Sequence, residues 1–420
     1  MFVRKTNWIK IIFGMAIASP QFAPTNSGLL KQINIARLLE LLRCHAPISR
    51  AELARLTGLT RSTVTVITAE LIAQKLVRES GEFSVSRGGG RPGRGLMLNP
   101  EGAFFIGAAI EVEHLTVVML NLAAQIVAKV QQPLVETAPE LVLPQLMQLI
   151  DQVRQANPSR DSRLRGIGLS IQGVLNLDGV VIRAPFFNWS GVDLRRYLQP
   201  HLDLPLFVDN DANAAALAEV YLGSAMQSSS LLYILINRGI GSGIILNNRV
   251  FRGAYGTAGE ISALMSDPPG QDNASECGHR VGKEDLLDRY WKQGGKATNL
   301  SELVEQLEQG EAIAHTVVQD WAENLGRGLI SVVSLLNPEQ IVLGGPLTVL
   351  FPYVKDSLMT RLRDEMPRQG EQGFFSNPKA KFEISSFGED ASAVGGAVLA
   401  YQSLFRVPDL VLRPMQQLAH

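Results

Sequence analysis

Phe207 to Glu219 reads F-V-D-N-D-A-N-A-A-A-L-A-E, and the rest of the chain is best understood from this stretch. The apolar residues that lead into it, from Leu204 to Val208, predict a short buried strand. The alanine-rich run that follows is typical of a helix, because alanine is the strongest helix former. Asp209, Asn210 and Asp211 would then stand at the positive end of that helix, where α/β folds place ligands. The alternative is an ordinary N-capped helix, in which Asn210 or Asp211 is only the cap.

Charge is divided unevenly along this chain of 420 residues, 46% of them hydrophobic. Residues 27–98 contain 11 Lys and Arg against 5 Asp and Glu, whereas residues 99–420 contain 25 basic and 35 acidic residues. A basic N-terminal part on an acidic body indicates that only the N-terminal part binds a polyanion. The two cysteines, Cys44 and Cys277, lie far apart in sequence, which argues against a disulfide framework and favours a reducing cytoplasm.

The first 26 residues contain an apolar run, Ile11 to Ala18, which three basic residues precede. This arrangement loosely imitates a signal peptide. The run is too short to cross a bilayer, which takes about 20 apolar residues. We expect residues 1–26 to be a disordered leader or a misassigned start, with Met15 as the true first residue, and we expect no membrane association.

Residues 27–86 have the pattern of a winged helix-turn-helix. Apolar residues at helical spacing predict a helix from Leu29 to Leu42. The capping box Ser49 to Glu52 begins a second helix, and Thr60 caps a third that runs to Gln74. The first turn of the third helix is polar, and this is the part of a recognition helix that meets base edges. The candidate DNA-binding residues in this turn are Arg61, Ser62, Thr63 and Thr65.

Two features after the third helix complete the predicted DNA-binding head. Lys75 to Val85 predict a β-hairpin that turns at Ser80-Gly81, and this hairpin is the wing. Residues 87–98 are an Arg/Gly linker that either only connects the domains or places Arg91 and Arg94 along a minor groove. The alternative for the head as a whole is a small three-helix structural domain, against which its basic excess argues.

From Leu96 onward, short strands alternate with helices, which is typical of an α/β fold. Two halves, each a strand meander followed by helices, predict two lobes with a cleft between them. We place the first lobe at residues 99–210 and 389–420 and the second lobe at residues 211–388.

Four motifs taken together resemble those of the ROK family of repressors and sugar kinases, on its repressor branch. They are N-D-A-N-A-A-A-L-A-E from Asn210, G-T-A-G-E from Gly256, N-P-E-Q-I-V-L-G-G from Asn337, and Gly395-Gly396 in the last helix. The resemblance covers about Leu29 to Ala400. It implies an α/β fold in which an N-terminal winged helix-turn-helix precedes a two-lobed, actin-like sugar-kinase body.

The resemblance also implies which residues bind a ligand. Asn210 and Asp211 fall on the family pair that contacts sugar hydroxyls, and in the kinases that Asp is the general base. Glu260 and Glu284 fall on two further sugar-contacting glutamates, and we add Asn188 as a candidate. Carboxylates and amides suit this role, because they bind the donor–acceptor pairs of vicinal hydroxyls bidentately.

The positions that correspond to the kinases' phosphate loops depart from the family pattern. The D-x-G-G-T loop reads A-I-E-V-E from Ala109 to Glu113, and the G-T-G loop reads Asn237-Arg238-Gly239. Glu111 and Glu113 would repel phosphates, and glycines that let backbone N–H groups approach an anion are missing. We therefore expect no catalytic residue, no cofactor and no phosphoryl transfer.

The family's zinc site is also incomplete. Its His position is Ala263, and its cysteine positions read Ser275, Cys277 and Gly282. One ligand of four remains, whereas a structural zinc ion needs three or four, so we expect no metal.

The sequence favours a cytoplasmic, sugar-responsive transcriptional regulator, a repressor of carbohydrate uptake or catabolism genes. Its head would bind a double-stranded DNA operator, and its body would bind a sugar without phosphorylating it. The family habit implies a homodimer or homotetramer. Two alternatives stay open: an ATP-dependent sugar kinase with a DNA-binding head, and a repressor controlled by a protein partner.

Overall fold

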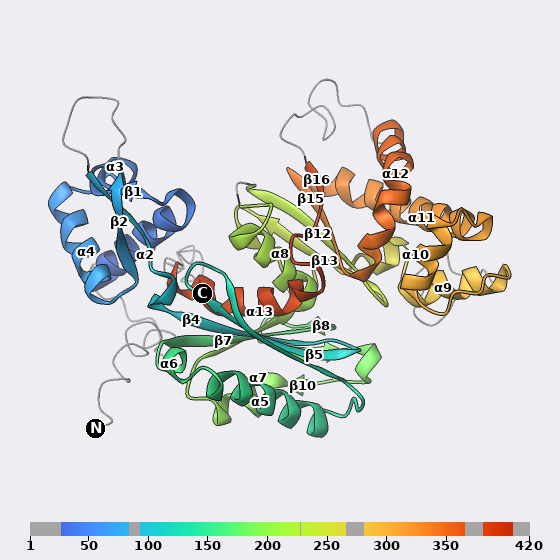
Figure 1. Cartoon of the computed structure of the whole chain (residues 1–420), viewed down its shortest axis with the longest axis horizontal. Helices are drawn as coiled ribbons and strands as arrows, with labels where there is room; N and C mark the ends of the chain where they lie inside the picture. Colours follow the sequence, from blue (N-terminus) through green and yellow to red (C-terminus); the bar gives the residue numbers. More distant parts are fainter. Residues whose placement is uncertain (1–26, 84–92, 227, 266–280, 366–380, 406–420) are drawn as a thin grey trace, which may run out of the picture.

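The protein consists of a small head at one end of a body that is built on two five-stranded β-sheets and also has a small three-stranded sheet of order β10-β9-β8 (Figure 1). The computed structural model describes residues 27–83, 93–226, 228–265, 281–365 and 381–405. Among these residues, no helix has the length and apolar character that crossing a membrane requires.

The described part of the head contains three helices and a three-stranded sheet. Ser49 caps α3, since its hydroxyl accepts a hydrogen bond from the Glu52 N–H at 3.1 Å. Thr60 caps α4 in the same way, with the Thr63 N–H at 3.2 Å. Both predicted helix starts are therefore confirmed. The elements are α2 (Ser27–His45), β1 (Ile48–Ser49), α3 (Arg50–Thr57), α4 (Arg61–Ala73), β2 (Val77–Phe83) and β3 (Gly93–Leu98).

The wing differs from the predicted hairpin. Ser80-Gly81 lie inside β2, at a register shift between Glu79 and Glu82, and the chain does not turn there. The strand that pairs with β2 is β3, so Gly93–Leu98 is part of the sheet and not the end of the linker predicted at 87–98. The prediction was wrong because a polar Ser-Gly pair is typical of a turn, yet a β-bulge accommodates it equally well.

The first lobe is built on a five-stranded sheet with the order β11-β7-β4-β5-β6. β4 is buried along its whole length, because α5 covers one face of the sheet and α13 (Ala391–Tyr401) covers the other (Figure 1). The elements of this lobe are β4 (Phe104–Ile110), β5 (His114–Asn121), β6 (Ile126–Pro133), α5 (Pro139–Gln155), α6 (Pro158–Asp161), β7 (Leu164–Ile171), β8 (Val174–Leu175), β9 (Val180–Arg183), β10 (Val192–Asp193), α7 (Leu194–Leu198) and β11 (Leu206–Asn210).

The second lobe is built on a five-stranded sheet with the order β14-β13-β12-β15-β16. Apolar side chains of β12 and β15 form one core with those of the helices α9 to α12. The elements are β12 (Ser230–Ile236), β13 (Ile240–Leu246), β14 (Arg249–Val250), α9 (Lys283–Lys292), α10 (Leu300–Glu308), α11 (Ala312–Leu336), β15 (Gln340–Gly344), α12 (Phe351–Glu365) and β16 (Lys381–Ile384).

Two helices, α8 (Asp211–Leu222) and α13, lie side by side between the two sheets (Figure 1). Glycines allow this close packing. A Cβ atom at Gly243 would lie 2.4 Å from the Ala212 carbonyl oxygen, and one at Gly395 would lie 2.1 Å from that of Ala214. The junction of β11 and α8 therefore lies where the two lobes meet.

Candidate ligand cleft and DNA-binding surface

The junction of β11 and α8 places Asn210 and Asp211 at the positive end of the helix. Asn210 is the cap, since its Oδ1 accepts from the N–H groups of Ala212 at 2.9 Å and Asn213 at 3.1 Å. Its Nδ2 donates to Asp211 Oδ1 at 2.8 Å and to the Gly173 carbonyl oxygen at 2.9 Å. The helix-cap alternative is therefore correct for Asn210, whereas Asp211 is the first residue of the helix and faces the space between the lobes.

Asp211 is buried, and burial raises its pKa to about 7. The backbone N–H of Ala212 opposes this rise, and the nearby Glu260 carboxylate adds to it. Glu260 lies in the loop after β14; partial removal of water from its carboxyl raises its pKa, and the Arg183 guanidinium opposes that rise. Asn210 is thus hydrogen-bonded to Asp211, and the exposed Glu260 lies near enough for its charge to act on Asp211. An acid that titrates near neutral pH can both donate a hydrogen bond to a sugar oxygen and accept one from a hydroxyl.

Two other predicted ligand residues have protein partners. Glu284, in the first turn of α9, forms an ion pair with Arg238 Nε at 2.8 Å. Asn188 is exposed and in the left-handed region, with φ of 58°, and its N–H donates to the Pro185 carbonyl oxygen at 3.1 Å. A ligand that uses Glu284 must therefore compete with a guanidinium.

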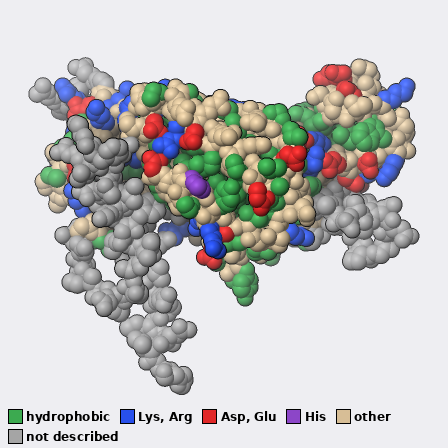
Figure 2. All heavy atoms as spheres, turned by 90° about the horizontal axis from the view of Figure 1, so that it is seen from below, with side chains coloured by type: hydrophobic (Ala, Val, Ile, Leu, Met, Phe, Trp, Pro, Cys, Tyr) green, Lys and Arg blue, Asp and Glu red, His purple; other side chains and the backbone are tan. Residues whose placement is uncertain are grey.

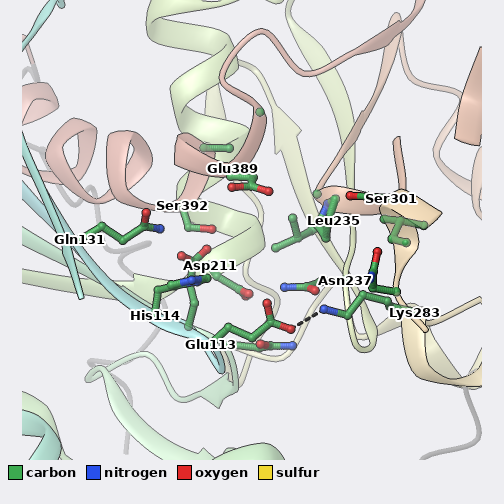
Figure 3. A pocket seen from close by; sticks show the side chains of 18 of the residues that line it. Glu113, His114, Gln131, Asp211, Leu235, Asn237, Lys283, Ser301, Glu389 and Ser392 are labelled. Carbon is green, nitrogen blue, oxygen red and sulfur yellow. Dashed lines mark hydrogen bonds and ion pairs between the residues drawn. The ribbon is translucent and has the colours of Figure 1, made fainter. Parts of the chain in front are cut away.

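A cavity of about 420 Å³ lies between the lobes and beside Asp211 (Figure 3). Most of its lining was not predicted, because the residues come from separate segments that only the packed lobes bring together. Asn299 is the lining residue that the sequence could have indicated. The pattern from Asn299 to Glu302 is that of a capping box, and Asn299 caps α10. The polar lining residues are Glu111, Glu113, His114, Gln131, Gln172, Asp211, Asn237, Lys283, Thr298, Asn299, Ser301, Glu389 and Ser392.

Two of these residues, Glu111 and Glu113, follow β4. Burial raises the pKa of Glu111 to about 8, the charge of Asp211 adds to the rise, and a hydrogen bond with the Ser392 side chain opposes it. Glu113 forms an ion pair with Lys283 across the lobes, and this hydrogen-bonded contact lowers the pKa of Glu113 (Figure 3). These residues do not fit the phosphate groups of a nucleotide: the ionised carboxylate of Glu113 would repel a phosphate, Lys283 is already paired with Glu113, and Glu111 places a side chain where the family's phosphate loop has a glycine.

The positions of the family's zinc ligands fall partly outside the described residues, as Ser275 and Cys277 do. Ala263 belongs to the short 3-10 helix Ile261–Met265, and Gly282 is the N-cap of α9. Within the part of the chain that the structure describes, no group of three or more His, Cys, Asp or Glu is placed to hold a metal ion. The absence of zinc stays a prediction.

The first turn of α4 faces solvent, as a recognition helix requires. Arg61, Ser62 and Thr65 are exposed, and Thr63 is half-buried. Hydroxyl contacts order this turn: Thr65 Oγ1 donates to the Arg61 carbonyl oxygen at 2.8 Å, and the Thr60 and Ser62 hydroxyls lie 2.9 Å apart. The exposed side chains of Arg61, Ser62 and Thr65 are thus accessible to DNA.

Sequence reasoning missed Val66, which is 64% exposed in the next turn of α4. The signal was present, because Val66 falls outside the buried spacing of Val64 and Ile67. An exposed valine here is suited to contact a thymine methyl group. Arg94 lies in β3 and pairs with Glu79 of β2 at 2.8 Å, and Arg91 lies outside the described residues.

The surface of the body differs from the basic head. On the face shown in Figure 2, acidic and basic side chains are interspersed over the body. Such mixing is typical of an ordinary solvated surface. The head, which is basic and has exposed polar side chains on α4, is therefore a better candidate for DNA binding than this face of the body.

Comparison with known families assigns both parts of the chain. Residues 33–78 match winged helix-turn-helix DNA-binding domains, and residues 105–403 match the ROK family. The chain belongs to the ROK family. The resemblance inferred from the motifs, and the fold class that it implied, are confirmed.

Transcriptional regulators match 80% to 91% of the chain. The xylose repressor of Caldicellulosiruptor bescii is 27% identical over 91% of this chain and 99% of its own length. The DNA-binding transcriptional dual regulator NagC of Escherichia coli is 25% identical over 80% of this chain and 87% of its own. A solved ROK family transcriptional regulator, a homolog of the E. coli MLC protein, has a TM-score of 0.75 at 27% identity and covers 90% of this chain and 97% of its own.

ROK kinases match a smaller share of the chain. The ROK hexokinase of Thermus thermophilus has a TM-score of 0.58 at 26% identity and covers 72% of this chain and 99% of its own. The ROK body therefore shares its fold with sugar kinases, and the repressors extend the match further along the chain.

Proposed function

We propose that this protein is a transcriptional repressor of carbohydrate uptake or catabolism genes, whose head binds a double-stranded DNA operator and whose body binds a neutral sugar. One observation carries the proposal. A winged helix-turn-helix is joined to a ROK body that groups Asn210, Asp211 and Glu260 but has Glu111 and Glu113 after β4. The cleft thus offers partners for sugar hydroxyls, and it has acids at the positions where the kinases' phosphate loop has a glycine and a threonine.

The donor set of the cleft favours a sugar without a phosphate. Carboxylates and amides bind vicinal hydroxyls as paired donors and acceptors. Asp211 and Glu260 are both acidic; the charge of Arg183 acts on Glu260, and Lys283, the cation in the cavity lining beside Asp211, is paired with Glu113. The names of the relatives, which include xylose and N-acetylglucosamine repressors, support a sugar as the effector.

A second candidate function is an ATP-dependent sugar kinase with a DNA-binding head. Asp211 favours it, because an acid with a pKa near 7 is suited to take the proton of an attacking hydroxyl. Glu111 and Glu113 oppose it, because both would meet the transferred phosphate. We therefore propose that the protein is not an enzyme.

Thermodynamic linkage would connect the sugar to DNA binding. A sugar that binds the closed lobes more tightly than the open lobes shifts the population toward closure. In a homodimer or homotetramer, closure changes the spacing of the heads. Two recognition helices reach one face of DNA only when their half-sites lie about 34–36 Å apart or at a multiple of that distance.

Calorimetry of the full chain tests the ligand assignment. The titrants are xylose, glucose, N-acetylglucosamine and their phosphates, and we expect a neutral sugar to bind. Asp211→Ala should weaken that binding by about 1–3 kcal/mol, because sugar donors lose their acceptor. Incubation with ATP, Mg²⁺ and the bound sugar should yield no sugar phosphate.

Each other outcome has a definite meaning. Equal binding to wild type and Asp211→Ala would refute the cleft assignment. Turnover of ATP would establish the kinase. Binding of none of these sugars would favour control by a protein partner.

A further inference from the structure

The first turn of α8 contains the candidate ligand residue Asp211, and its last turn contacts the head. Asp211 begins the helix, and Tyr221 lies in the final turn before Leu222. A helix of 12 residues is about 18 Å long. One element therefore extends from the cleft to the surface on which the head rests.

Arg43 of α2 contacts the C-terminal end of α8. Its Nη1 donates to the Tyr221 carbonyl oxygen at 2.8 Å, and its guanidinium carbon lies 4.8 Å from the centroid of the Tyr221 ring. Glu40 holds the guanidinium in a two-pronged contact, with Arg43 Nε 3.0 Å and Nη2 2.5 Å from its two carboxylate oxygens. The Arg43 side chain is only 8% exposed. Carbonyl groups in the last turn of a helix lack helical partners and carry partial negative charge, so a guanidinium is well matched there.

The head joins the first lobe by a different route. Its chain runs from β3 through Asn99 into β4, and Asn99 Nδ2 donates to the Lys75 carbonyl oxygen at 2.7 Å. Its apolar core also continues into the first lobe and α13, where it includes Phe105 and Tyr401, and it reaches the last turns of α8 at Ala218. A shift of α8 along α13 would therefore displace Tyr221 relative to the part of the body that carries the head.

α8 is also bonded to the second lobe, near its C-terminal end and along its face. Buried Glu219 accepts hydrogen bonds from Ser385 Oγ at 2.7 Å and from the Ser386 N–H at 3.0 Å. Gly243 of β13 leaves no room between the strand and Ala212. Closely packed elements change between discrete arrangements instead of deforming continuously. A shift at the cleft end of α8 is therefore carried to Tyr221.

We infer that α8 and Arg43 transmit lobe movement to the DNA-binding head, because the Arg43–Tyr221 contact differs between the two lobe arrangements. The inference rests on the proposed function, since it needs a sugar that changes the arrangement of the lobes. Arg43 is a positioning residue in this scheme, because it acts on the head through α8.

The test compares Arg43→Ala and Arg43→Lys with a matched control, Arg37→Ala. Arg37 is exposed on the same helix, so its loss removes the same charge without touching α8. Fluorescence anisotropy with a duplex that wild type selects from a random pool gives the operator Kd, with and without xylose, glucose or N-acetylglucosamine. The ratio of the two Kd values is the coupling factor, and calorimetry gives the sugar Kd of each variant.

We expect wild type and Arg37→Ala to share a coupling factor, which typically lies at about 5- to 150-fold. Arg43→Ala should bind sugar and sugar-free operator as wild type does, with a coupling factor within about twofold of one. Arg43→Lys keeps the charge but not the planar fork, so its factor should fall between the two. If Arg43→Ala does not fold, Arg43→Lys decides the question.

Three results overturn the inference, and they are distinguishable. A wild-type coupling factor in both Arg43 variants refutes the inference and leaves the proposed function intact. Loss of sugar binding in the Arg43 variants shows that Arg43 supports the fold of the body instead of the coupling. Sugars that leave operator binding unchanged in wild type and Arg37→Ala refute the proposed function and the inference together.

Discussion

Removal of water from the half-buried carboxyl of Glu111 should make the folded body less stable as the pH rises. Its pKa is raised from 4.5 to about 8 in the folded chain. Between these values the folded chain keeps a proton that the unfolded chain has released, so raising the pH favours unfolding. The free energy of unfolding falls by up to about 1.4 kcal/mol per pH unit for one such group. Asp211, whose pKa rises from 3.8 to about 7, acts in the same direction below pH 7.

Glu111→Gln replaces this acid by a neutral amide of similar shape and removes its part of the pH dependence. The free energy of unfolding of the variant minus that of wild type should therefore increase as the pH rises from about 5 to about 8. The total increase should be on the order of a few kcal/mol. Urea unfolding at several pH values measures the difference. Tryptophan fluorescence is a suitable signal, because Trp189 lies in the core of the first lobe and Trp321 in that of the second.

Glu113→Gln is the control, two residues further along the chain. The Lys283 contact lowers the pKa of Glu113, so its stabilisation is present above about pH 4.5 and is lost as the pH falls through the lowered pKa. The variant should lose that stabilisation at neutral pH, by about 0–1 kcal/mol because the pair is partly exposed. The two variants thus differ in sign. Identical pH slopes for wild type and Glu111→Gln would refute the role of burial at Glu111.

Three further substitutions test other parts of the account. Arg61→Ala should weaken operator binding by about 1–3 kcal/mol if Arg61 reads a guanine; unchanged binding in a gel-shift titration at fixed salt would remove it from the reading surface. Thr60→Ala should destabilise the head by about 1 kcal/mol in chemical denaturation, because α4 loses its cap, and an unchanged midpoint would contradict that role. Arg252→Ala should destabilise the body by about 3 kcal/mol in urea unfolding, since buried Asp209 loses its ion-pair partner; a cost near zero would show that other donors suffice.

Local signals made much of the fold predictable. Ser49 and Thr60 cap helices because a hydroxyl before an apolar helical pattern satisfies free N–H groups, and this requires no distant residue. The strand and alanine-rich helix around Asn210 were predictable for the same reason. The wing was not, because β2 pairs with β3 across residues 84–92, and no local pattern specifies a partner that far away.

The cleft was predictable only where a family motif marks it. Asn210, Asp211 and Glu260 carry such motifs; of the three, Asp211 lines the cavity, Asn210 is hydrogen-bonded to it, and Glu260 lies near enough for its charge to act on Asp211. Gln131 and Glu389 carry none, because a polar residue acquires this role only when packing turns it toward the cavity. The Arg238 partner of Glu284 is also a product of packing between the strand turn and α9.

Operator binding in the presence of sugars, without ATP, tests the central claim most directly. Anisotropy titrations with the selected duplex should show that one neutral sugar among xylose, glucose and N-acetylglucosamine changes the operator Kd of wild type. Asp211→Ala should bind the duplex as wild type does without sugar and should lose the response. An operator Kd that none of these sugars changes, or an undiminished response in Asp211→Ala, would contradict the account.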